Sequence, residues 1–175
     1  MTLASARFAT PLGPMLGVAT EAALVLLEFE ERPELARELD DLARGAAIVE
    51  GANEPLARLE RELSEYFAGE LHEFQTPVEL RGTAFQRSAW LELLKIPAGA
   101  TITYLQLAHA VGNPKSFRAV AQANGANRMA VVVPCHRVVN TNGGLGGYAA
   151  GLERKRWLLQ HERTFFGGRA AGMLF

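Results

Sequence analysis

A cysteine and a histidine stand side by side near position 135, and they are the residues of this sequence best suited to chemistry. Cys135 is the only cysteine among 175 residues. Pro134 precedes it, and His136 and Arg137 follow it. Positively charged neighbours lower the pKa of a thiol and favour the thiolate, its nucleophilic form. A histidine can remove the thiol proton as a general base. The segment therefore indicates a nucleophilic cysteine.

The alternative is that Cys135 is only a core residue, because cysteines outside disulfides are among the most buried residues. The apolar run Val131–Val133 predicts a buried strand that ends just before the thiol. Consecutive side chains on a strand point to opposite faces, so Cys135 and His136 act together only through a bend or a bridging water. Three consecutive polar or reactive residues nevertheless favour a reactive site.

Glu162 is the candidate for orienting the histidine, which a catalytic base requires. The second half of the chain contains only three acidic residues, Glu92, Glu153 and Glu162. Glu162 directly follows the helix predicted over Leu152–His161. We therefore expect Glu162 to hold the ring of His136.

The two halves of the sequence carry opposite charges, although the net charge of the chain is only −1. Residues 1–80 have a net charge of −10 and residues 81–175 one of +9. A division this sharp favours two domains, with a surface for a polyanion on the second. The simpler interpretation is that the two halves attract one another.

Two predicted helices in the second half form the pattern of a helix-turn-helix. The capping box Thr103–Gln106 starts a helix that ends at Gly112, and Asn113–Lys115 makes the turn. Ser116 is expected to cap a second helix that runs to about Asn124. An ordinary helical hairpin gives the same pattern.

Positive charge at the start of the second helix favours DNA binding over an ordinary hairpin. Lys115 and Arg118 lie where the helix macrodipole disfavours cations. Ala119 and further alanines give this helix small side chains, so it can approach another surface closely. Together these features predict that the second helix contacts an anionic partner.

The first half predicts a small α/β domain without grouped polar residues that resemble an active site. The expected strands are Leu3–Ala9, Met15–Thr20 and Ala23–Phe29, and the expected helices are Pro33–Arg44 and Glu54–Ala68. Residues 69–82 form an expected linker. The helix that follows it opens with the capping box Thr83–Gln86. We place the domains at 1–78 and 79–165, with a C-terminal tail over 166–175.

Composition excludes several classes of protein. Apolar residues make up 49% and charged residues 21%, which is typical of a globular protein. No apolar run reaches the roughly 18–20 residues of a membrane span, and the first residues lack the pattern of a signal peptide. A single cysteine excludes an internal disulfide and a multi-cysteine zinc site. We expect a cytoplasmic protein with neither metal nor cofactor.

The segment Pro134-Cys135-His136-Arg137-Val138 resembles the active-site motif of the methylated-DNA–protein-cysteine methyltransferases, also called O6-alkylguanine-DNA alkyltransferases. Further residues follow the family's order and spacing: Tyr104, Gly112-Asn113-Pro114, Arg118-Ala119-Val120, Asn127, Gly147-Tyr148, Gly151-Leu152, Arg154-Lys155, and Leu158-Leu159 followed by Glu162. The resemblance is strong over residues 80–163 and looser over the first half.

The resemblance implies an α/β (α+β) fold. A ribonuclease-H-like N-terminal domain would precede a helical C-terminal domain with the helix-turn-helix and the reactive cysteine. The implied activity is direct-reversal DNA repair, in which an alkyl group moves from O6 of guanine to Cys135 and inactivates the protein. O4-alkylthymine is a second candidate substrate. The partner would be double-stranded DNA carrying the alkylated guanine, bound in its minor groove by a monomer that flips the base into a pocket.

The family motif assigns the reaction to four residues. Cys135 would attack the alkyl carbon as a thiolate, and His136 would remove its proton through a water molecule. Glu162 would orient the ring of His136. Asn127 would hold the turn between the DNA-contacting helix and the cysteine.

The resemblance also assigns residues to the DNA and to the base. Arg118 would fill the space that the flipped base leaves, and Tyr104 would crowd the phosphate of the flipped nucleotide and help to bind the base. The further DNA-binding residues would be Lys115, Ser116, Ala119 and Asn124. The pocket would comprise Tyr104, Cys135, Val138, Tyr148 and Ala149, with the carbonyls of Cys135 and Val138 accepting hydrogen bonds from the exocyclic amine of the base.

Three features depart from the family pattern. Arg128 stands where a proline is usual, and Ala150 stands where a glycine is common in the pocket loop. The N-terminal cysteines that bind zinc in some members are absent. Ala150 bears on the size of the alkyl group that the pocket accepts.

Overall fold

The computed structural model describes residues 1–173, which form two compact units. The first unit consists of Met1–Glu79 with Arg128–Ala130, and the second of Leu80–Asn127 with Val131–Phe175. The sequence does not predict that Arg128–Ala130 joins the first unit. Within the described residues, none of the helices has both the length and the apolar character of a membrane span.

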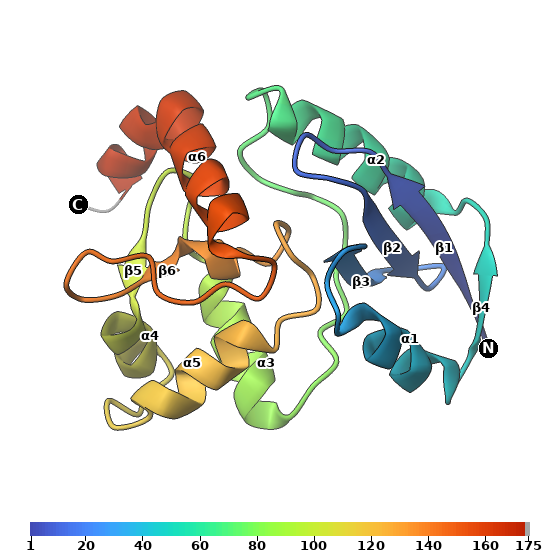
Figure 1. The fold of residues 1–175 in the computed structure, drawn as a ribbon, viewed down its shortest axis with the longest axis horizontal. Helices are drawn as coiled ribbons and strands as arrows, with labels where there is room; N and C mark the ends of the chain where they lie inside the picture. The colour runs from blue at the N-terminus through green and yellow to red at the C-terminus, as the bar shows by residue number, and fades with distance from the viewer. Residues whose placement is uncertain (174–175) are drawn as a thin grey trace. The chain divides into compact units, whose positions relative to one another are not determined.

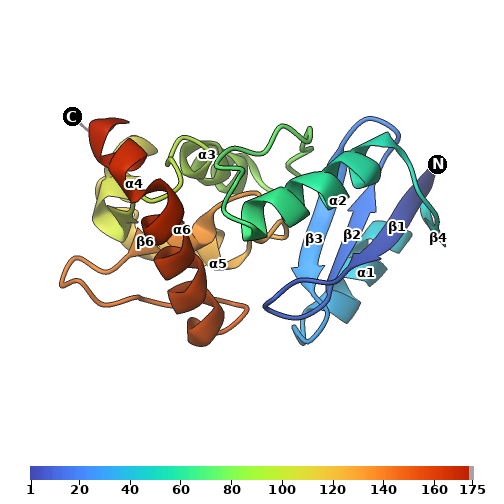
Figure 2. The ribbon, with the colours of Figure 1, turned by 90° about the horizontal axis from the view of Figure 1, so that it is seen from above.

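The first unit is a four-stranded sheet in the order β3-β2-β1-β4, with helices on its two faces (Figures 1 and 2). Its elements are β1 (Thr2–Phe8), β2 (Met15–Ala19), β3 (Leu24–Phe29), α1 (Leu35–Ala43), β4 (Ala47–Glu50) and α2 (Glu54–Phe67). β2 pairs antiparallel with β1 and β3, whereas β4 runs parallel to β1. The three predicted strands and two predicted helices are confirmed. β4 is not predicted, because it is short and mostly exposed and shows no apolar alternation.

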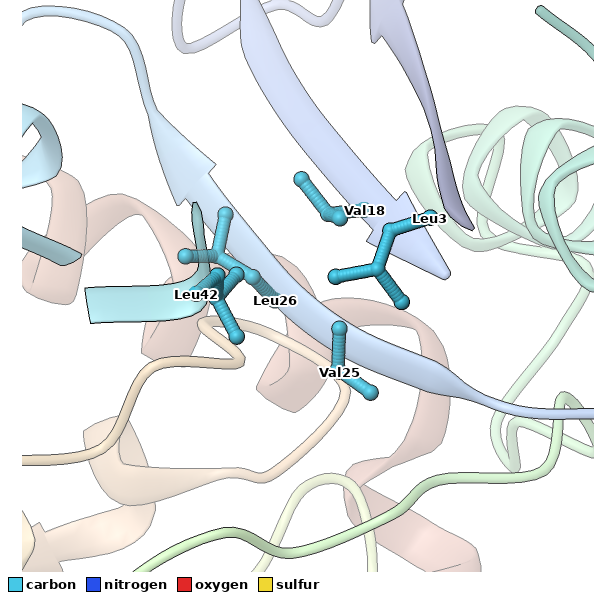
Figure 3. Close-up of a cluster of buried hydrophobic side chains, with 5 residues drawn as sticks. All are labelled: Leu3, Val18, Val25, Leu26 and Leu42. Carbon is cyan, nitrogen blue, oxygen red and sulfur yellow. The ribbon is translucent and has the colours of Figure 1, made fainter. Parts of the chain in front are cut away.

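Apolar side chains fill the space between the sheet and α1. The buried centre of this cluster consists of Leu3, Val18, Val25, Leu26 and Leu42 (Figure 3). On the opposite face, α2 depends on Gly17, where a Cβ would lie 2.8 Å from the Phe8 ring and 3.2 Å from Leu56 Cδ2. The glycine therefore lets α2 approach β2 closely.

A buried group of charged side chains joins the end of β3 to α1. Arg32 forms an ion pair with Glu28, and its guanidinium lies 3.5 Å from the carboxylate of Glu38. All three side chains are buried. Burial raises the pKa of Glu28, and the charge of Arg32 acts in the opposite direction. The group ties two elements of the scaffold together.

Arg128 connects the returning segment to the first unit. Its backbone oxygen accepts a hydrogen bond from Leu27 N (2.8 Å), and Ala130 N donates to Leu27 O (2.9 Å). The guanidinium of Arg128 lies 2.8 Å from the carboxylate of Asp41 and lowers the pKa of Asp41 by hydrogen bonding. The residue that departs from the family's proline therefore has a partner on α1.

The second unit surrounds a short pair of parallel strands (Figure 1). Its elements are α3 (Ala84–Leu93), β5 (Ile102–Thr103), α4 (Tyr104–Ala110), α5 (Phe117–Gly125), the 3-10 turn η1 (Cys135–Arg137), β6 (Val138–Val139) and α6 (Leu152–Met173). The capping boxes predicted at Thr83 and Thr103 are confirmed. α3 supports α5 through a hydrogen bond from Trp90 Nε1 to Ala123 O (2.8 Å).

α4 and α5 form the predicted helix-turn-helix. Gly112 ends α4 with a φ of +83°, a conformation that favours glycine. Ser116 stands at the start of α5, but its hydroxyl donates to Asn113 O (2.6 Å) and does not cap the helix. The predicted cap is therefore wrong, because Ser116 has φ −86° and ψ 26° and not the extended backbone from which a capping oxygen reaches the first N–H groups of the helix.

Two other predictions in the second unit are wrong. Val131–Val133 forms a turn instead of a strand, and Val131 has a φ of +73°. The run is buried without a strand partner in the described chain, so its apolar character reflects burial and not sheet pairing. Residues 166–173 of the predicted C-terminal tail belong to α6, and residues 174 and 175 lie outside the described residues.

Most of the predicted linker over residues 69–82 belongs to the first unit, which extends to Glu79. Glu62 of α2 accepts hydrogen bonds from the backbone N–H groups of Gln75 (2.5 Å) and Thr76 (2.7 Å), and from the Thr76 hydroxyl. Further along, Val78 pairs with β3. Buried N–H groups require acceptors, and the carboxylate of Glu62 supplies them.

Replacing Glu62 with alanine should lower the free energy of unfolding by about 1–3 kcal/mol, because the N–H groups of Gln75 and Thr76 lose their acceptor. Urea unfolding followed by circular dichroism measures this loss. Glu60→Ala, an exposed position on the same helix, is the control and should change stability by less than about 0.5 kcal/mol. Equal losses in the two variants would contradict the role given to Glu62.

Candidate active site

Cys135 begins a tight turn, so its side chain and that of His136 do not alternate as they would on a strand. Cys135 N donates to Val133 O (2.8 Å), and Arg137 N donates to Pro134 O (3.0 Å). A 3-10 turn has about three residues per turn, so consecutive side chains are separated by roughly a third of a rotation. The chain therefore bends between Cys135 and His136, which removes the opposite-face arrangement of a strand.

The thiol lies in the wall of a cavity of about 330 Å³ within the second unit. The lining residues are Tyr104, Phe117, Ala121, Asn124, Gly125, Cys135, Asn140, Gly147, Tyr148 and Ala149. Cys135 itself is only 7% exposed. A substrate must therefore enter the cavity to reach the sulfur.

Glu162 of α6 is bound to two residues of η1. Its Oε1 lies 2.7 Å from His136 Nε2, and its carboxylate accepts hydrogen bonds from Arg137 Nη2 (2.8 Å) and Arg137 Nε (2.9 Å). Arg137 Nη1 donates in addition to Ile96 O (2.5 Å). The structure thus brings together the predicted pair of His136 and Glu162, and it directs Arg137 toward the carboxylate.

The buried charges keep Glu162 ionised and His136 neutral. Burial raises the pKa of Glu162, but the hydrogen bond from His136 and the charge and hydrogen bonds of Arg137 outweigh it and hold the pKa well below its usual range. Burial lowers the pKa of His136; Glu162 opposes this shift, and Arg137 adds to it. A neutral imidazole that donates from Nε2 to a carboxylate carries its lone pair on Nδ1. His136 Nδ1 is buried and has no hydrogen-bond partner among residues 1–173.

Asn127 holds the turn that leads to the cysteine. Its side chain is 4% exposed, and its Nδ2 donates to Val133 O (2.9 Å). Val133 O also receives the hydrogen bond from Cys135 N. Asn127 is therefore linked through one carbonyl to the backbone of Cys135, a contact of the kind that its predicted role requires.

Lys155 joins two walls of the site, and the sequence assigns it no role. Its Nζ donates to Val138 O (2.7 Å) and Gly147 O (3.0 Å) and lies 5.9 Å from the centre of the Tyr104 ring. Burial lowers the pKa of Lys155 to about 8, and Cys135 acts in the opposite direction. Its distance of seven residues from Glu162 on α6 is two helical turns, a signal that both share a face.

The predicted DNA-binding residues divide into an exposed and a buried group. Lys115, Arg118 and Ala119 are exposed at the start of α5. Ser116 is buried in the turn. Asn124 is 4% exposed, and its Nδ2 donates to Cys135 O (3.2 Å), so it faces the cavity and not the surface. Whether Asn124 also contacts DNA stays a prediction, because its side chain lies at the cavity beside Cys135.

Four of the five predicted pocket residues line the cavity. These are Tyr104, Cys135, Tyr148 and Ala149. Val138 is fully buried, and its carbonyl receives the hydrogen bond of Lys155. The carbonyl of Cys135 accepts hydrogen bonds from Val138 N as well as from Asn124.

Gly146 in the pocket loop leaves space for the ring of Tyr104. Gly146 has a φ of +72°, and a Cβ there would lie 2.8 Å from Tyr104 Cε2. Ala150, which departs from the family's glycine, does not line the cavity, and its carbonyl accepts a hydrogen bond from Arg154 Nη1 (3.0 Å). Within the described residues, no three His, Cys, Asp or Glu side chains gather as metal ligands would.

Both units match known protein families. Residues 84–164 match the DNA binding domain of 6-O-methylguanine DNA methyltransferase, and residues 4–80 match its ribonuclease-like domain. The methylated-DNA–protein-cysteine methyltransferase of Shigella flexneri is 42% identical over 93% of this chain and 96% of that protein. The protein of the same name from Methanosarcina acetivorans is 40% identical over 90% and 96% of the two chains.

Solved structures agree with these matches. The O6-methylguanine methyltransferase of Mycobacterium tuberculosis has a TM-score of 0.80 at 36% identity, covering 94% of this chain and 93% of that one. OGT of the same organism in complex with DNA also has a TM-score of 0.80 at 36% identity, with 94% of each chain covered. The predicted fold class and the family resemblance are confirmed. This chain belongs to the methylated-DNA–protein-cysteine methyltransferase family.

Proposed function

We propose that this protein repairs DNA by direct reversal, moving an alkyl group from O6 of guanine to Cys135 and ending its activity in the same step. The observation that carries the proposal is a buried thiol in the wall of a cavity, next to a histidine that a buried carboxylate orients. The relatives are named for transfer from methylated DNA to a protein cysteine. Family membership and the local geometry therefore support the same chemistry.

Proton transfer uses the ring nitrogen of His136 that Glu162 leaves open. Because Nε2 donates to Glu162, Nδ1 is the basic atom, and it takes the thiol proton through a water molecule. The thiolate of Cys135 then attacks the alkyl carbon. The S–C bond forms as the C–O6 bond breaks, and the electron pair of that bond passes to the base. The proton that His136 took from the thiol then passes to the base and restores guanine.

Base flipping follows from the burial of the thiol. A base stacked inside a duplex cannot bring its substituent to a sulfur that is 7% exposed in a cavity. The alkylated nucleotide must therefore leave the stack. The exposed cations at the start of α5 are suited to phosphates, and we propose that this helix enters the minor groove. We also propose that the protein acts as a monomer.

O4-alkylthymine carries the same alkyl–oxygen bond on a smaller ring, so we include it as a second substrate of the same cavity.

A reactive thiol without a disulfide partner requires a reducing compartment, and the cytoplasm provides one.

Cys135→Ser should abolish alkyl transfer and leave DNA affinity nearly unchanged, because a hydroxyl is far less acidic than a thiol. The measurement uses DNA radiolabelled on the alkyl group of O6-methylguanine: label on the protein supports transfer, and label that stays on the DNA contradicts it. His109→Ala, an exposed histidine of α4, is the control for a substitution in the same unit and should transfer normally. Transfer by the serine variant at the normal extent would refute the assignment.

Arg118→Ala should slow repair of duplex DNA much more than reaction with free O6-methylguanine. The guanidinium compensates the loss of stacking, which costs a few kcal/mol in a duplex and nothing for the free base. Lys115→Ala removes a neighbouring charge and serves as the control: it should weaken DNA binding, but with DNA at saturating concentration it should leave the ratio of the two rates unchanged. Equal losses of Arg118→Ala on both substrates would place Arg118 at the base instead of in the stack.

Each protein molecule should react once. The chain has no second cysteine to accept the alkyl group, and a thioether is a poor leaving group. Quantifying repaired guanine against protein, with DNA in excess, should give at most one product per molecule. The reacted protein should carry the added methyl mass on the peptide that contains Cys135. More than one product per molecule would rule out the single-turnover mechanism.

A further inference from the structure

Phe117 occupies a position that neither the family motif nor the mechanism above explains. It is the first residue of α5, it lines the cavity that contains Cys135, and it is 45% exposed. Large apolar side chains are usually buried, and an exposed aromatic ring at the mouth of a cavity is a common feature of ligand sites. Lys115, two residues before it, and Arg118, directly after it, belong to the expected DNA-contacting set.

The ring of Phe117 is paired with the ring of Tyr104. Their centres lie 6.0 Å apart, with 65° between the ring planes. Two further neighbours hold the Tyr104 ring in place: Gly146 lies at its edge, and the ammonium of Lys155 lies near its face. A flat ligand that stacks on one of two rings at this angle meets the other ring at its edge. Stacked and edge-to-face contacts are the two favourable arrangements of aromatic rings.

We propose that Phe117 is a substrate-binding residue that stacks on the purine ring of the flipped base. This inference rests on the proposed function, and it assigns to Phe117 the recovery of stacking that the base loses when it leaves the duplex. The contact is to the ring system and not to the O6 substituent, so it strengthens binding of every O6-alkylguanine alike.

The alternative role is a wedge that enters the base stack, as apolar side chains do in some minor-groove proteins. Consecutive residues of a helix point about 100° apart, so Phe117 and Arg118 cannot enter the same space. Phe117 points to the cavity and to Tyr104. We therefore assign insertion into the base stack to Arg118 and contact with the flipped base to Phe117.

Phe117→Ala should raise the substrate concentration that gives half the maximal single-turnover rate by about 5- to 150-fold, the equivalent of the roughly 1–3 kcal/mol of a base–aromatic stack. The maximal rate itself should stay within about twofold, because stacking binds the ground state and the transition state equally. Free O6-methylguanine and free O6-benzylguanine are the two substrates, and both should show the same loss. Phe117→Tyr should restore normal binding, since it keeps the aromatic ring.

Leu105→Ala is the matched control. Leu105 is also a large apolar residue, 42% exposed on the adjacent helix α4, and it does not line the cavity. Its substitution should leave both constants unchanged. A Phe117→Ala variant that binds both free bases normally, or that loses only the benzyl substrate, would overturn the stacking contact. A wild-type protein that reacts with neither base nor with alkylated duplex DNA would instead overturn the proposed function.

Discussion

A single buried carboxylate sets the geometry on which the rest of the site depends. Glu162 is fully buried, and it binds both the imidazole of His136 and the guanidinium of Arg137. Removing one partner from such a group leaves an uncompensated charge in the interior, which typically costs about 3–5 kcal/mol. The same contacts attach α6 to the turn that carries the thiol. The long C-terminal helix is therefore required for the chemistry as well as for the packing of the second unit.

The pairing with Glu162 changes which groups activate the thiol. The sequence indicates that both His136 and Arg137 favour the thiolate, but the charge of Arg137 is balanced by Glu162. The lone pair of His136 and the ammonium of Lys155 remain for Cys135. A negative sulfur raises the pKa of Lys155, and by the same interaction a protonated Lys155 stabilises the thiolate. Lys155 also binds the carbonyls of Val138 and Gly147, so the same charge holds the turn and the pocket loop together.

Much of this arrangement could be predicted from the sequence, because short-range signals carry it. The capping boxes, Gly112 in the turn and the adjacent Cys135 and His136 all act within a few residues. The errors come from patterns that have two causes. Val131–Val133 is apolar because it is buried, and periodicity cannot separate a buried turn from a buried strand. The inward direction of Asn124 and the partners of Arg137 depend on segments far away in the chain, which a single sequence does not reveal.

Because the thiol is buried, the proposed reaction also needs exposed residues at the start of α5. A thiol that is 7% exposed is shielded from solvent and other reagents, but it is equally inaccessible to a base inside a duplex. Under the proposed function, the alkylated base must therefore leave the stack at a cost of a few kcal/mol, and exposed groups next to the cavity are suited to offset that cost. At the start of α5, Lys115, Phe117 and Arg118 are exposed together, next to the mouth of the cavity. Reactivity and recognition thus occupy adjacent but differently exposed surfaces, so each can be altered without the other.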